Sequence, residues 1–86
     1  MGNNIAQMKK LVAESEHYHS EILRMEAQQE DQIRASGQPL DQHIIYLVGK
    51  ALEANPWYNR AISKRNSAAV RATMYGIAAI VLGEEE

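Results

Sequence analysis

The residues best suited to binding a metal ion are Glu16 and His19. A glutamate and a histidine three residues apart on a helix point the same way, and ferritin-like bundles use this pair as two ligands of a di-metal site. Such a site also needs a glutamate from each of two further helices, and the second predicted helix offers only Asp41 and Glu53, at its ends. The simpler interpretation is a solvated helix surface, so no resident metal or cofactor is expected.

No pattern in the sequence predicts nucleophilic catalysis. The serines lack the glycine-flanked turn that exposes a catalytic serine, and the five glycines are scattered rather than gathered in a phosphate-binding loop. The chain has no cysteine, which excludes a thiol nucleophile, a disulfide scaffold and a cysteine-based zinc module. We therefore expect a protein that is not an enzyme.

Basic residues gather on one side of the last predicted helix. This helix has four basic residues and no acidic one, although the net charge of the chain is −2. At 100° per residue, Arg60, Lys64 and Arg71 fall within an arc of about 40°. We call these three residues the basic stripe. Together with the neighbouring Trp57 and Tyr75, the stripe is the candidate binding site for a ligand or partner.

Three kinds of partner suit the basic stripe. The first is the acidic side of the first predicted helix, within one subunit or between two. The second is an acidic partner protein. The third is a phosphate-bearing ligand, because arginines beside aromatic rings suit phosphates and bases. Nucleic acid itself is not expected, because three basic residues on a chain of negative net charge are a weak electrostatic footprint.

A long first helix is predicted over about residues 4–36. Asn3 or Asn4 can cap its start, and Gly37 is well placed to end it. Such a helix is about 48 Å long, whereas a compact globule of this size has a radius of gyration of about 12 Å. The helix must therefore project, break, or lie along another helix or another chain.

Two more helices follow along the chain. The second is predicted over about 39–54, with Pro39 in its first turn, and the third over about 56–82, with Asn55 as its N-cap. An acidic tail, 84–86, closes the sequence. The second helix has a regular apolar stripe, typical of a buried helix face. Its residues are Leu40, Ile44, Leu47, Val48, Ala51 and Leu52.

The end of the third helix is apolar on every side, with Thr73 as its one polar residue after Arg71. A helix of this kind is normally buried all round, and 86 residues supply little material to surround it. We therefore expect this segment to form the centre of a homo-oligomer. The residues expected at that interface are Ala72, Ile77, Ile80 and Val81.

A face of small residues on the third helix predicts where another helix packs, because small side chains let two helices approach closely. It consists of Ala61, Ala68, Ala72 and Ala79. The expected fold is all-α, with a single domain over residues 1–86. In it the second and third helices form an antiparallel hairpin, and the first lies along them or along a neighbouring chain.

The composition and the first residues of the sequence indicate in which cellular compartment the protein is expected. Apolar types make up 45% of the chain and charged types 23%, which excludes a disordered tail. The first residues lack the basic-then-apolar pattern of a signal peptide, and the longest apolar stretch is about half of what spans a bilayer. We expect a cytoplasmic protein with no membrane partner.

A spaced pattern occupies the last third of the chain: a proline and two aromatic residues, then a spaced alanine, an arginine, and a closing tyrosine and alanine pair. The residues are Pro56, Trp57, Tyr58, Ala61, Arg65, Ala68, Ala72, Met74, Tyr75, Ile77, Ala78 and Ala79. The pattern resembles that of small helical proteins encoded by phages of actinobacteria, from which Trp57 and Gly76 depart. The resemblance implies a phage accessory protein in the cytoplasm of a bacterial host, and it implies no mechanism.

The function expected is that of a non-enzymatic helical interaction protein. It would self-associate through the third helix and bind a host protein through exposed helical surface. The alternative is an oligomer that binds a phosphate-bearing small ligand, such as a nucleotide, through the basic stripe.

Overall fold

The computed structural model describes residues 3–37 and 41–84, which form three α-helices and no strand. Helix α1 spans Asn4–Ala35, α2 spans Gln42–Glu53 and α3 spans Pro56–Val81. The predicted all-α fold with three helices is confirmed. Helix α2 begins at residue 42 rather than 39, and the predicted place of Pro39 lies outside the described residues.

The ends of the helices follow local sequence signals. The Asn55 side chain caps α3, because its Oδ1 accepts hydrogen bonds from the backbone N–H groups of Trp57 (2.9 Å) and Tyr58 (3.4 Å). Gly37 and Gly83 end α1 and α3 with φ of 76° and 68°, a left-handed conformation that glycine adopts without steric cost. The sequence therefore predicts these three ends correctly.

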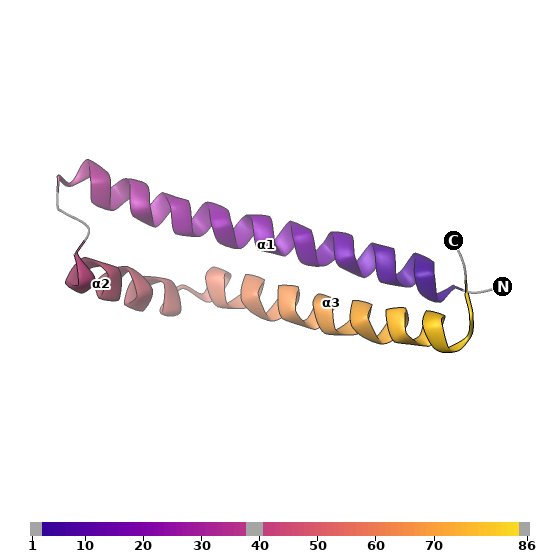
Figure 1. Ribbon diagram of the computed structural model, residues 1–86. Coiled ribbons are helices and arrows are strands. Elements are labelled where there is room, and N and C mark those ends of the chain that lie inside the picture. Colours follow the sequence, from indigo (N-terminus) through magenta and orange to yellow (C-terminus); the bar gives the residue numbers. More distant parts are fainter. Residues whose placement is uncertain (1–2, 38–40, 85–86) are drawn as a thin grey trace.

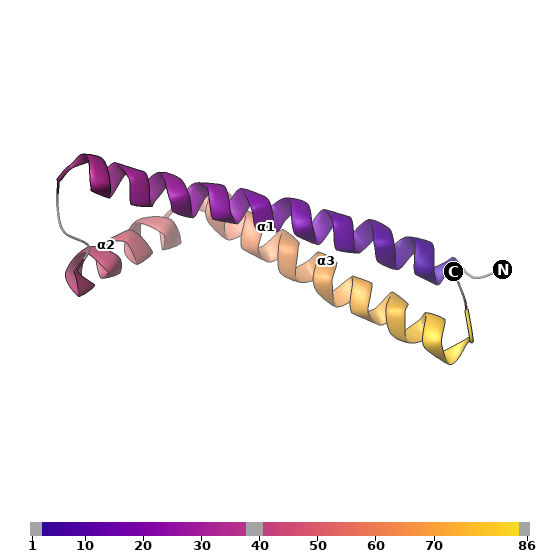
Figure 2. The same ribbon diagram turned by 45° about the horizontal axis from the view of Figure 1, so that its top comes forward.

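Helix α1 pairs with α3, and the two run antiparallel along most of their length (Figure 1). The expected hairpin of α2 with α3 differs from this arrangement. Only Ala54 and Asn55 separate α2 from α3, and the chain does not reverse there, so the two helices follow one another along the same side of α1 (Figure 2). The reversal comes earlier, between α1 and α2.

The contact between α1 and α3 is built on alanine. Helix α3 buries Ala61, Ala68, Ala72 and Ala79, which are each 3% to 6% exposed. The larger side chains of α1 cover them, with Leu11 packed against Ala68 and Ala72. The predicted small-residue seam is therefore confirmed, and α1 is the helix that packs on it.

The molecule is a rod rather than a globule. Its extents are 58 × 19 × 18 Å and its radius of gyration is 18.0 Å. The accessible surface is 6400 Å², whereas a folded monomer of 9.7 kDa is expected to expose about 5100 Å². The long first helix neither breaks nor projects, because α3 and α2 lie along it (Figure 1).

Within the single chain, the apolar end of α3 is covered on one side only, so the expected burial on its other sides would need a second chain and stays a prediction. Ala72 and Ala79 face α1 and are buried, whereas Ile77, Ile80 and Val81 are exposed. Ala72 therefore belongs to the seam within the chain and not to the exposed surface that could join two copies.

Candidate functional site

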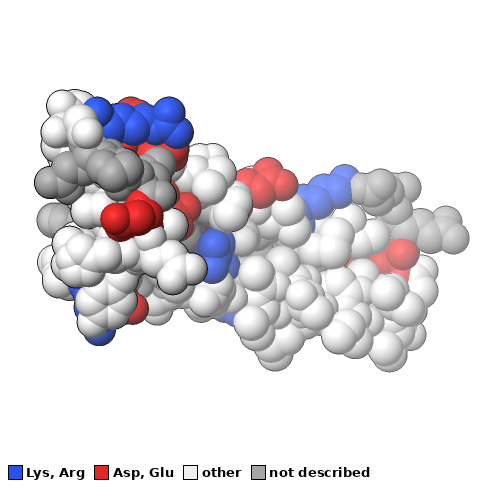
Figure 3. Space-filling view, turned by 60° about the vertical axis from the view of Figure 1, so that its left-hand side comes forward, with Lys and Arg blue, Asp and Glu red and all other residues white. Residues whose placement is uncertain are grey.

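A group of exposed apolar side chains lies on the C-terminal half of α3 and on its C-cap residue, Leu82. Its side chains are between 57% and 80% exposed, and we call them the α3 apolar surface: Val70, Met74, Ile77, Ile80, Val81 and Leu82. Val70, Met74, Ile77 and Val81 are spaced four, three and four residues apart, which is the spacing of a coiled-coil seam. Figure 3 shows this part of the molecule, at lower right, as a nearly uncharged surface.

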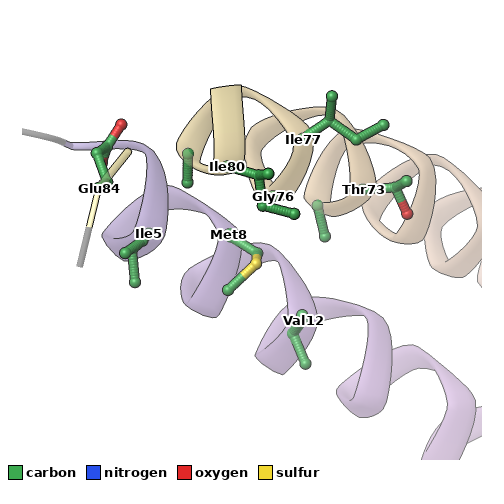
Figure 4. A pocket seen from close by; sticks show the side chains of 10 residues that line it. Ile5, Met8, Val12, Thr73, Gly76, Ile77, Ile80 and Glu84 are labelled. Atoms are coloured by element: carbon green, nitrogen blue, oxygen red, sulfur yellow. The ribbon is translucent and has the colours of Figure 1, made fainter. Parts of the chain in front are cut away.

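An apolar groove of about 660 Å³ runs between α1 and α3 next to this surface. Ile5, Met8 and Val12 line it from α1 (Figure 4). Thr73, Gly76, Ile77 and Ile80 line it from α3, with Ala72 and Ala79 at the base. Both helices therefore contribute to one continuous apolar face.

Gly76 lets α1 approach closely within the groove. A β-carbon at this position would lie 3.2 Å from Sδ of Met8, which is closer than ordinary van der Waals contact. The sequence gives a signal for such a site, because glycine in the interior of a helix is unfavourable and often has a packing reason. In the sequence, Gly76 stands out only as a departure from the phage-protein pattern, so its packing role comes from the structure.

Glu84 lines the end of the groove, beside the first turn of α1 (Figure 4). After Gly83 the backbone N–H of Glu84 donates to the carbonyl of Ala79 at 2.9 Å, which turns the chain back toward α1. The Glu84 carboxylate then accepts a hydrogen bond of 3.1 Å from the backbone N–H of Asn4 and another from the Asn4 side chain. A residue 80 positions away thus caps the first turn of α1.

Polar contacts cross the seam at its other end. The Tyr58 hydroxyl donates a hydrogen bond of 2.9 Å to Oε2 of Glu26. Burial, followed by the hydrogen bond and charge of Glu26, raises the pKa of Tyr58, and the charge of Arg65 lowers it by less. The Ser15 hydroxyl donates to the backbone carbonyl of Arg65 at 3.3 Å. These bonds fix the register of α3 on α1.

The basic stripe is exposed and does not pair with α1. Among the residues that the structure describes, no ion pair joins Arg60, Lys64 or Arg71 to an acidic side chain. The ion pairs found there form within single helices, for example between Arg24 and Glu21 at 2.7 Å. Pairing of the stripe with α1 inside one subunit is therefore absent from this structure.

The predicted binding residues separate into two hollows rather than one pocket. Trp57 and Arg60 line the first, together with His17, Glu21 and Arg24 of α1. The second is lined in part by Arg71 and Tyr75.

The distance between these hollows limits what they can bind together. Arg60 and Arg71 are 11 residues apart, which is about 16 Å along a helix. Lys64 lines neither hollow. The five residues do not converge on one small ligand, and an elongated partner would be needed to contact all of them.

The candidate metal ligands Glu16 and His19 are both exposed on α1. In residues 3–37 and 41–84, no three histidine, aspartate or glutamate side chains come close enough together to hold a metal ion. Nδ1 of His19 lies 3.3 Å from Nη1 of Arg65, and this nitrogen must accept the hydrogen bond because arginine can only donate. The guanidinium of Arg65 thus occupies one of the two ring nitrogens through which His19 could bind a metal ion.

Helix α2 is less buried than its regular stripe predicts. Leu52 is buried, but Leu47 and Ala51 are exposed, as are Ile45 and Tyr46. The reason is that only the C-terminal part of α1 lies beside α2. There, Glu26, Glu30 and Ile33 of α1 line a hollow together with residues of α2. Leu40 of the same predicted stripe lies outside the described residues.

Within the described part of the chain, no helix has the length and apolarity needed to cross a membrane. No protein-family model matches the chain, and comparison with curated proteins and with solved structures finds no similar protein.

Proposed function

We propose that this chain is a non-enzymatic helical interaction protein that self-associates and binds a second protein. The observation that carries the proposal is the α3 apolar surface, a group of large apolar side chains left exposed on one end of a rod. Contiguous apolar surface of this kind marks protein–protein contacts in soluble proteins. The interface residues that remain from the sequence prediction are Ile77, Ile80 and Val81.

The small core of the single chain supports self-association. Among the described residues, the buried apolar side chains are Leu11, Ile22 and Leu52 together with four alanines. Alanine buries little apolar area, and the burial of apolar area is the dominant favourable term in folding. Chains of this size without disulfides or metals commonly gain the missing stability by oligomerisation.

The second partner is proposed to be a host protein, and the setting to be a bacterial cytoplasm. This part of the proposal rests on the resemblance of residues 56–79 to proteins encoded by phages of actinobacteria. The basic stripe adds a physical preference. Its three cations form no ion pair with any described acidic residue, and such cations on one helix favour a partner with an acidic surface.

Substitution of Ile77 by aspartate tests the self-association. Ile77 is 57% exposed in the single chain, so Ile77→Asp leaves α3 folded but places a charge in the proposed interface. We expect native mass spectrometry and light scattering to show an oligomer for the original chain and a monomer for the variant. Ser63→Asp is the matched control, since Ser63 is exposed on the same helix outside the apolar surface. An Ile77→Asp chain with the original subunit number would contradict the proposal.

Binding of a phosphate-bearing ligand by one part of the basic stripe is the second candidate function. It is favoured because, among the residues that the structure describes, Arg60, Lys64 and Arg71 form no ion pair. Titration with ATP, followed by calorimetry, tests it. Saturable binding that Arg71→Glu abolishes without changing the oligomer would support this function. No heat of binding with ATP or with inorganic phosphate would remove it.

A further inference from the structure

We propose that the groove between α1 and α3 is covered by the same groove of a second copy, packed antiparallel, so that two hairpins form a four-helix bundle at their apolar ends. The inference rests on the proposed self-association. It adds which face of the chain is used and how the two copies are oriented.

The shape of the groove favours a helix pair as its occupant. Both helices line it, with Ile5 and Val12 on one side and Ile77 and Ile80 on the other (Figure 4). The covering surface must therefore be two helices wide, and a second copy presents a surface of this width and of the same apolar character.

The accessible surface of the single chain is also large enough to accommodate an interface with a second copy. The chain exposes about 1300 Å² more than expected of a folded monomer of its mass. A standard protein interface covers about 800 Å² on each partner. One second copy that covers an interface of this size would therefore remove more than half of the excess.

Charges on the same face favour the antiparallel orientation. At 100° per residue, Glu16 lies about 40° around α1 from Val12, one turn farther from the apolar end. On α3 the corresponding charged residue is Arg65, which contacts His19 of α1. In a parallel dimer the two rods would overlap along their whole length, which would bring the charged residues of both copies into contacts across the interface, where desolvation of charged groups is costly.

An antiparallel pair avoids these contacts, because the copies overlap only at their apolar ends. The polar parts of the two rods then extend in opposite directions into solvent. The pairing is isologous, since the same patch is used on both chains, as in most homodimers.

The basic stripe stays accessible in this arrangement. At 100° per residue, Arg71 lies about 180° around α3 from Ile80, so it faces away from the groove. The dimer would present one basic stripe on each side. The two stripes, like the two hairpins, would run in opposite directions.

Disulfide trapping tests the inference directly, because the chain has no cysteine of its own. Thr73→Cys and Ile80→Cys are made separately, with tags of different mass, and oxidised alone and as a mixture. The two positions are about 10 Å apart along α3, and a disulfide needs α-carbons within about 7 Å. In the antiparallel dimer, position 73 faces position 80, so we expect the mixed disulfide to exceed either like disulfide several-fold.

Each other outcome overturns a distinct part of the argument. Like disulfides at both positions in a dimer would show parallel packing and leave the proposed self-association intact. A dimer without disulfides at either position would show that another surface joins the copies. A monomer in light scattering would remove both the proposed function and this inference. Ser67→Cys, exposed and away from the groove, measures random collision.

Discussion

Met8 of α1 packs directly against Gly76 in α3. The two residues are so close that a β-carbon added to Gly76 would lie only 3.2 Å from the methionine sulfur. The two residues belong to opposite ends of the sequence. Their contact holds the first turns of α1 against the last turns of α3, and it forms part of the apolar groove.

Substitution of Gly76 by valine should therefore destabilise the protein by about 1–3 kcal/mol, because the added methyl groups force Met8 and the backbone apart. Chemical unfolding followed by circular dichroism measures the change. Gly49→Val is the matched control, since Gly49 is also inside a helix and a β-carbon there would meet no atom within 4 Å. Equal effects at the two glycines would show that Met8 moves freely.

Removal of the Tyr58 hydroxyl should lower the unfolding free energy by up to about 1 kcal/mol, since Tyr58→Phe loses a hydrogen bond across the seam. Tyr46→Phe is the control, because Tyr46 is 59% exposed on α2. A loss of stability at both tyrosines would point to a general effect of the hydroxyl groups.

The same hydrogen bond should make stability depend on alkaline pH. The pKa of Tyr58 is raised in the folded chain, so its stabilising contribution is complete below the usual tyrosine pKa of about 10. This contribution is lost as the pH rises through the raised value. Thermal unfolding between pH 8 and pH 11 should show a steeper fall for the original chain than for Tyr58→Phe, and parallel curves would contradict the assignment.

Loss of the α3 cap should be costly. Asn55→Ala removes the acceptor for the Trp57 and Tyr58 amides, and the expected loss is about 1 kcal/mol. Asn55→Asp keeps an acceptor oxygen and should retain most of the stability. The midpoint of urea unfolding compares the two variants, and a loss of similar size in both would show that the cap contributes little.

Neutralisation of Glu84 should loosen the start of α1. Glu84→Ala removes both hydrogen bonds to Asn4 and the negative charge beside the positive end of the helix dipole, together about 1 kcal/mol. Hydrogen exchange should accelerate in the first turn of α1. Glu53→Ala, in an exposed pair with Lys50 at 3.7 Å, should leave that turn unchanged. Unaltered exchange in Glu84→Ala would contradict the role.

The helix ends were predictable because they depend on a few adjacent residues. Asn55 followed by proline, and Gly83 after an apolar run, each determine a terminus through local hydrogen bonds and allowed dihedral angles. The alanine seam was predictable for a similar reason, because helical periodicity places Ala61 and Ala68 on one face.

The choice of helix partners depends on contacts that no local pattern contains. We expected α2 to form a hairpin with α3, yet the chain does not reverse between these two helices. The role of Glu84 depends on where the chain goes after Gly83, and the tail therefore gave no signal for a cap 80 residues away. The position of Ala72 in the seam follows from the same pairing.

The pairing of α1 with α3 has a consequence for how the chain folds during synthesis. Ribosomes make α1 first, but Ala68 and Ala72, which pack against Leu11, come from the last third of the sequence. Contacts that join residues so far apart must close a long loop before they contribute stability, which slows folding relative to local helical pairs. The apolar face of α1 therefore stays exposed to solvent until α3 has been synthesised. During that interval a chaperone can bind it.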